Sequence, residues 1–238
     1  MDAKESYNLT YPYLDVEAEY QKDLTDIIEQ NFLFQELIEE NYPHNNCSFG
    51  AIGYGLRWIC ESFGITLVKR RFVDCFGNGG CAAFYASSYG FSEVVSIEYS
   101  SSSFKHAESV LKTIHDKGIR CNVKLKEGSM QDYFSCDSDI IYFDCSTCII
   151  DSMIDEGLLL DILFRLSKDL QAGSFLIVCT YGTSLSTEDL KAMGHGHLVC
   201  LNHTEVSYSK VVESELNEDI DSLDLWILKC IELQYSRK

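Results

Sequence analysis

The sequence has only two prolines, and it lacks any apolar run of the roughly 18 residues that a membrane-spanning helix needs. So few prolines argue against disordered linkers, and 46% apolar residues are enough to build a buried core. A chain of 238 residues suits one α/β domain with a modest extension, or two small domains. We predict a helical extension over residues 1–45 and a main domain over residues 46–238.

Basic residues are scarce, with 19 Lys and Arg against 37 Asp and Glu, which gives a formal net charge of −18. Such a surface repels the phosphate backbone of nucleic acids and attracts cations. The dense basic cluster Lys69-Arg70-Arg71 precedes an apolar run and is most simply a solvated strand entrance. We therefore expect no direct nucleic-acid binding and no membrane association. The charge favours a basic protein substrate or a basic partner subunit, although solubility alone would also explain it.

Eleven cysteines are scattered through apolar runs, and their number is odd. This pattern is typical of a reducing compartment in which thiols serve as small apolar side chains. Cys145 and Cys148 form one CxxC pair, but no second pair stands at zinc spacing, so we expect no metal site. The acidic, polar start of the sequence is unlike a secretory signal. We expect an intracellular protein, cytoplasmic or nuclear.

Apolar periodicity predicts helices and strands that alternate through the middle of the chain. The expected helices cover 16–42 (one long or two broken), 55–64, 80–89, 102–117, 155–170 and 187–193. The expected strands cover 71–76, 93–100, 121–128, 139–145, 174–181, 197–209 and 223–233. The alternation predicts a parallel sheet of the α/β class, and the last two strands, with no helix between them, predict an antiparallel hairpin.

The stretch "FVDCFGNGG", residues 72–80, ends an apolar strand in Asp74 and then places three glycines in four positions. Glycines let a strand–turn–helix connection turn sharply and approach a ligand closely. Phe76 and Asn78 do not match a dinucleotide-binding GxGxxG loop. The next expected strand ends in Glu98, where an acid can accept both hydroxyls of a ribose. The pair predicts a site for a nucleoside without phosphates; the alternative is a tight turn and a surface acid.

These pieces resemble the class I S-adenosylmethionine-dependent methyltransferases over roughly residues 46–233. The matching segments are "FVDCFGNGG", the ribose acid in "SIEYS", the adenine loop "KEGSMQDYF" and the strand "DIIYFDC". The resemblance implies a Rossmann-like, mostly parallel seven-stranded sheet with a C-terminal antiparallel hairpin, and S-adenosyl-L-methionine as cofactor. It also implies cofactor-binding roles for Asp74, Phe76, Gly77, Asn78, Gly80, Glu98, Tyr99, Ser129, Met130 and Asp144.

A closer resemblance is to the disruptor-of-telomeric-silencing family, the non-SET histone lysine methyltransferases. It is carried by "YGLRWICESFGITLVKRRFVDCFGNGG" and "SIEYSSSSFKHAESVLKTI". The chain departs from that family's pattern at five positions: Leu56, Phe76, Asn78, Ser129 and Asp144. An aromatic residue at the position of Phe76 also occurs in trimethylguanosine synthase-like RNA methyltransferases, but their Pro-Pro-Trp signature is missing here.

Methyl transfer to an amine needs an aligned, neutral nucleophile. Asp144 ends the expected central strand, where it would steer an ammonium group and accept a hydrogen bond from the amine. Tyr54 and Tyr181 would border the pocket and attract a cation to their ring faces. The alternatives are a solvated carboxylate and two core aromatics. The resemblance thus implies a methyltransferase, acting on lysine in a basic protein such as a histone. An inactive fold relative that binds a partner and an RNA or small-molecule methyltransferase are the alternatives.

Overall fold

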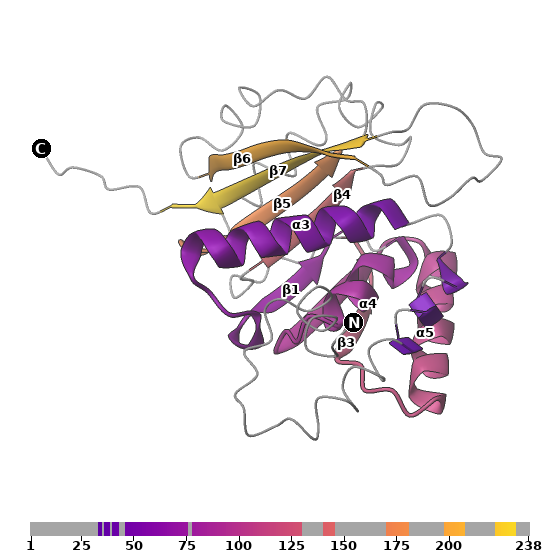
Figure 1. Cartoon of the computed structure of the whole chain (residues 1–238). Coiled ribbons are helices and arrows are strands. Elements are labelled where there is room, and N and C mark those ends of the chain that lie inside the picture. Colours follow the sequence, from indigo (N-terminus) through magenta and orange to yellow (C-terminus); the bar gives the residue numbers. More distant parts are fainter. Residues whose placement is uncertain are drawn as a thin grey trace, which may run out of the picture.

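The computed structural model describes residues 33–34, 36–38, 40–42, 46–75, 78–129, 140–145, 170–180, 198–207 and 222–231. Within these segments, helices pack on one face of a twisted sheet (Figure 1). The strands are β1 (Arg71–Asp74), β2 (Glu93–Glu98), β3 (Val123–Glu127), β4 (Ile140–Cys145), β5 (Phe175–Thr180), β6 (Leu198–Ser207) and β7 (Ser222–Cys230).

The seven strands lie in the order β3-β2-β1-β4-β5-β7-β6. The first five are mutually parallel, whereas β7 pairs antiparallel with both β5 and β6. This arrangement confirms the predicted mostly parallel, seven-stranded sheet with a C-terminal antiparallel hairpin. Because β1 to β5 run the same way, their carboxyl ends meet at one edge, where loops can form a site.

The central strands are apolar because both of their faces are covered. In β4, the four residues Ile140 to Phe143 are all buried. Phe72, Tyr142 and Ile177 point into the core that the helices cover. Val73, Val95, Ile141, Phe143 and Val178 alternate with these residues and are buried on the opposite face.

The helix α3 (Asn46–Phe63) crosses the sheet next to α4 (Cys81–Ser87) and packs on β5 and β7 (Figure 1). It begins nine residues before the start at Gly55 that the sequence analysis gives. That prediction of the start is wrong, because the helix continues through Gly53 and Gly55, which are packing positions. A Cβ at Gly53 would lie 2.9 Å from Tyr89 Oη, and one at Gly55 would lie 3.1 Å from Ile177 Cδ1. These glycines let α3 approach α4 and β5 closely.

The helix α5 (Ser101–Asp116) packs on β2 and β3 through Ala107, Val110 and Ile114. Its N-cap is Ser100, whose Oγ accepts a hydrogen bond from the Ser103 amide at 3.4 Å. The helix expected over 102–117 therefore begins one residue earlier than predicted. Two short 3₁₀ turns complete the described helices, η2 (Leu67–Lys69) and η3 (Asn78–Gly80).

The described residues between 33 and 42 are helical up to Asn41 and share the core of the main domain. Phe34, Leu37, Ile38 and Tyr42 are all buried there. Figure 1 shows these short indigo pieces beside α5. The division at residue 45 stays a prediction, but the two parts have no separate cores where the structure describes them. The expected helices over 187–193 and over 155–170, apart from Leu170, lie outside the described residues.

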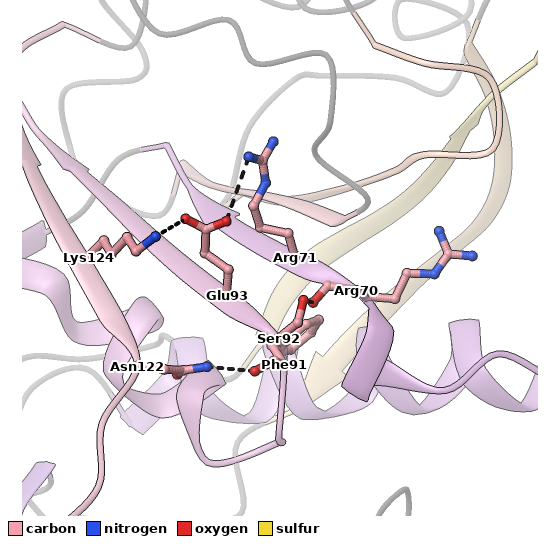
Figure 2. A network of polar contacts seen from close by, with 7 residues as sticks. All are labelled: Arg70, Arg71, Phe91, Ser92, Glu93, Asn122 and Lys124. Atoms are coloured by element: carbon pink, nitrogen blue, oxygen red, sulfur yellow. Dashed lines mark hydrogen bonds and ion pairs between the residues drawn. The ribbon is translucent and has the colours of Figure 1, made fainter.

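The amino ends of β1, β2 and β3 are joined by a polar network, opposite the edge where the parallel strands end (Figure 2). Glu93 at the start of β2 accepts a hydrogen bond from Lys124 Nζ at 2.7 Å and faces Arg71 at 4.0 Å. The Lys124 bond, followed by the charges nearby, lowers the pKa of Glu93. Arg71 thus lies at the start of a strand, where the sequence analysis expects the basic cluster to lie.

The seven cysteines whose side chains the structure describes are free thiols, and five of them are buried. This use matches the expected role of cysteine as a small apolar side chain. None of the described helices is both long and apolar enough to cross a membrane.

The tight approach of α3 to β5 makes Gly55→Ala a test of the fold. The added methyl group should cost about 1–3 kcal/mol by overpacking against Ile177, and this outweighs a gain of ~1 kcal/mol in helix propensity. We expect a net loss of about 1 kcal/mol in the free energy of unfolding, measured by urea denaturation. Ile177→Val removes Cδ1, so the double variant should lose less than the sum of the two single variants. A stabilised Gly55→Ala protein with no coupling to Ile177 would contradict this packing.

Candidate functional site

Two buried acids end neighbouring strands at the carboxyl edge of the sheet. Asp74 ends β1 and is 1% exposed, while Glu98 ends β2 and is 2% exposed. The register places Asp74 beside Ser96, so Glu98 stands two residues further along the same edge. Burying a carboxylate is costly unless it is paired or hydrogen-bonded, and such acids concentrate at functional sites.

The Glu98 carboxylate lies against the glycine turn that follows β1. It accepts hydrogen bonds from the backbone amides of Gly79 and Gly80, and one from Ser96 Oγ at 3.3 Å. Gly79 and Gly80 have φ of 74° and 82°, in the left-handed region that other residues rarely adopt. The sequence therefore needs glycine at both positions to aim two consecutive amides at one acid.

Space also requires glycine at this turn. A Cβ at Gly80 would lie 2.8 Å from Phe84 Cε2 and 3.3 Å from Ala107 Cβ. A Cβ at Gly79 would lie 3.2 Å from His106 Cδ2 and 3.4 Å from a Tyr42 ring carbon. The turn is thus packed between α4, α5 and the N-terminal segment, and its backbone faces the acid.

Burial raises the pKa of Glu98 above its ordinary value, although the amides of Gly79 and Gly80 and the Ser96 hydroxyl act in the opposite direction. The three donors favour the charged form, but they do not fully replace the water that the carboxylate has lost. The fold therefore keeps an acid at a position where its charge costs stability.

Tyr42 closes the other side of the turn and is the site residue that sequence reasoning missed. Its ring is 6% exposed and meets the His106 ring edge-on, with 5.2 Å between centroids. Its hydroxyl donates a hydrogen bond to the Gly79 carbonyl oxygen. Burial, and then the nearby charges of Cys81, Glu98 and Asp74, raise the pKa of Tyr42, so the phenol stays a neutral donor. No spacing signal links residue 42 to a turn 37 positions away.

Two further predicted cofactor residues lie near this edge. Tyr99 follows Glu98 directly and is 84% exposed. Ser129 is partly buried and follows Gly128, whose amide donates to the Glu98 carbonyl oxygen at 2.9 Å. Both residues are thus next to the acid along the chain or through the backbone.

Asp144 lies in β4, one residue before its end, where it pairs with Cys179 of β5. Because β4 neighbours β1, the Asp144 backbone stands at the same edge as Asp74. The side chains of Asp144 and Asn78 lie outside the described part of the structure. So do the whole residues Phe76, Gly77, Met130 and Tyr181, and their predicted roles stay predictions.

Tyr54 lies on α3, and its hydroxyl contacts β6 and not the glycine turn. It is 38% exposed on α3, and its hydroxyl lies 3.5 Å from Nδ2 of Asn202, which donates to it from β6. β6 ends the sheet on the side opposite β3. The structure therefore brings Asp74, Glu98 and the glycine turn together, while the Tyr54 hydroxyl faces another part of the sheet. Its proposed catalytic role stays a prediction.

In the segments that the structure describes, no three or more His, Cys, Asp or Glu side chains gather in a way that could hold a metal ion. The site there is built from a carboxylate, backbone amides and hydroxyl groups. These are the partners that sugar hydroxyls and amino groups use in binding.

Comparison with models of protein families and with curated proteins finds no match. Solved structures do match. An S-adenosylmethionine-dependent methyltransferase from Clostridium acetobutylicum aligns at a TM-score of 0.56 and 11% identity, over 82% of this chain and 97% of that one. The N-methyltransferase NodS from Bradyrhizobium japonicum aligns at a TM-score of 0.51 and 10% identity, over 76% of this chain and 94% of that one.

The chain has the class I methyltransferase fold. At such low identity the likeness concerns the fold alone. The closer resemblance to the disruptor-of-telomeric-silencing family finds no support in these comparisons. Within the class I methyltransferase fold, the acid at the end of β2 and the glycine turn after β1 are the two features that the sequence analysis singled out.

The raised pKa of Glu98 predicts how a Glu98→Gln variant responds to pH. A raised folded pKa means that the cost of the buried charge disappears as the pH falls through that pKa toward the ordinary value of 4.5. Relative to the wild type, the glutamine variant should therefore be more stable at neutral pH than at acidic pH. Urea denaturation of both proteins between about pH 4 and pH 8 measures this difference. A difference that is flat with pH, or that shifts in favour of the wild type as the pH rises, would contradict it.

Proposed function

We propose that this chain is an S-adenosyl-L-methionine-dependent methyltransferase and that Glu98 binds the ribose of the cofactor. The observation that carries the proposal is the buried Glu98 carboxylate, held at the end of β2 under the amides of the glycine turn. A group that costs stability is kept where it serves binding or chemistry.

The residues present fit a nucleoside. A carboxylate has about four lone-pair directions, and three are taken by Gly79, Gly80 and Ser96. A ribose hydroxyl donating to the fourth direction would complete the set. The exposed ring of Tyr99 is free to lie along an adenine face, and Ser129 is close enough along the backbone to contact its edge.

S-adenosyl-L-methionine supplies a methyl group on a sulfonium centre, which a neutral nucleophile attacks in line. The chain has to orient the nucleophile and keep it deprotonated. Asp144, near the end of β4 and beside β1, is proposed to steer the incoming ammonium group and to orient the amine once it has lost its proton, with Tyr54 and Tyr181 as proposed aromatic walls. An incoming lysine would donate a hydrogen bond from its amine to the Asp144 carboxylate.

The proposed substrate is lysine in a basic protein such as a histone. The formal charge of −18 supports it, because a strongly acidic surface attracts basic chains and repels RNA. The same charge would serve a basic partner subunit.

Calorimetric titration with S-adenosyl-L-methionine and S-adenosylhomocysteine tests the cofactor proposal. Glu98→Ala removes the acceptor of the ribose hydroxyl and should weaken binding on the order of 10²-fold, since a hydrogen bond to a charged group contributes about 1.5–3 kcal/mol. Glu93→Ala, at the other end of the same strand, is the matched control and should keep wild-type affinity. Folded wild-type protein that binds neither compound would refute the proposal, and so would equal loss in the two variants.

Transfer of a labelled methyl group identifies the substrate class. Label should appear in histones or other basic proteins, and the rate should fall as salt rises, because salt screens the attraction between opposite charges. Asp144→Asn should lower turnover by about 10²-fold when cofactor is saturating. Label in RNA would favour an RNA methyltransferase instead. Cofactor binding without any transfer would favour a non-catalytic binding protein.

A further inference from the structure

One peptide unit connects Tyr42 to Glu98. The Gly79–Gly80 peptide offers its carbonyl oxygen to the Tyr42 hydroxyl and its N–H to the Glu98 carboxylate. In a trans peptide the C=O and N–H point in opposite directions in one plane. Tyr42 and Glu98 therefore form hydrogen bonds to opposite sides of the same peptide group, although Tyr42 comes from the N-terminal segment and Glu98 from β2.

Side chains of its own two residues do not fix the orientation of this peptide, so hydrogen bonds and packing must do so. Both of its residues are glycines with positive φ, and no Cβ restricts a rotation of the plane by half a turn. Rotation would turn the carbonyl oxygen toward the Glu98 carboxylate and remove the Gly80 amide from it. The hydrogen bond from Tyr42 opposes that rotation, because rotation would leave a buried hydroxyl without its acceptor.

Tyr42 is itself held firmly. Its ring packs against His106 of α5 and lies near Phe84 of α4, with centroids 5.2 Å and 6.3 Å away. The preceding helical residues Leu37 and Ile38 are buried in the common core. The hydroxyl thus has a fixed position from which to set the orientation of the turn.

We propose that Tyr42 is a positioning residue of the cofactor site: it fixes the Gly79–Gly80 peptide so that the Gly80 amide faces Glu98. The effect on the cofactor rests on the proposed function, whereas the effect on the turn does not. It follows that docking of the N-terminal segment on the turn and binding of the cofactor are cooperative, since each stabilises the same orientation of the Gly79–Gly80 peptide.

Several titratable groups surround Tyr42 and Glu98 within the described elements. They are Asp74 on β1, Cys81 on α4, His106 on α5 and Glu127 on β3. The test must therefore compare the Glu98 titration between proteins that keep all four groups, as the wild type and Tyr42→Phe do.

Tyr42→Phe in the full chain tests the proposal, since it removes one oxygen and keeps the ring packing. Without cofactor, the Glu98 carboxyl, followed by carbon NMR, should titrate at a higher pH than in the wild type, because it loses a donor to its charged form. Affinity for S-adenosylhomocysteine should fall about tenfold, the effect of one buried hydrogen bond. Tyr89→Phe is the matched control: it removes a buried hydroxyl that bonds Tyr85 at 3.1 Å, and should leave both measurements unchanged.

Two results would overturn the proposal. One is an unchanged Glu98 titration in folded Tyr42→Phe protein. The other is fast hydrogen exchange of the Gly80 amide in the wild type, which needs no variant, because a fixed peptide protects that amide. If the wild type binds no cofactor while the Glu98 titration still moves in Tyr42→Phe, the positioning of the turn stands and the proposed function fails.

Discussion

The hydrogen bonds from two consecutive glycine amides to the Glu98 carboxylate are the interaction on which the rest of the site depends. They join the turn after β1 to the end of β2, and they are made only because Gly79 and Gly80 adopt positive φ. They compensate in part for the burial of a charge, yet the pKa of Glu98 remains raised. That residual cost is the physical argument for a ligand at this position.

The fold supplies this interaction with support from three directions. The parallel pairing of β1 with β2 sets the two acids side by side. Phe84 on α4 and Ala107 on α5 pack so tightly on Gly80 that no side chain fits there. Tyr42 approaches from the N-terminal segment and bonds the Gly79 carbonyl. The core and the site are thus one structure around a single turn.

Much of the fold could be predicted from the sequence because its periodicity is plain. The apolar run of β4 and the alternation of strands and helices gave the parallel sheet, and the missing helix between the last two strands gave the hairpin. Local signals failed where packing decides. The helix expected from Gly55 starts at Asn46, and the missing side chains of Gly53 and Gly55 are what let α3 reach Tyr89 and Ile177.

In the candidate site, too, some residues could be predicted from the sequence and others could not. Asp74, the glycine turn and Glu98 were predicted because each has a local pattern at a strand end. Tyr42 has none, since its role comes from a tertiary bond to Gly79. The substrate could not be derived from the described residues, because net charge restricts the class of partner and specifies no atom of it.

The most direct measurement of the central claim compares S-adenosylhomocysteine with an analogue that lacks the two ribose hydroxyls, in the wild type and in Glu98→Ala. If the carboxylate accepts from the ribose, removing the hydroxyls should weaken binding to the wild type strongly and binding to the variant very little. An equal loss of affinity in both proteins would show that Glu98 does not hold the sugar, and would contradict the account.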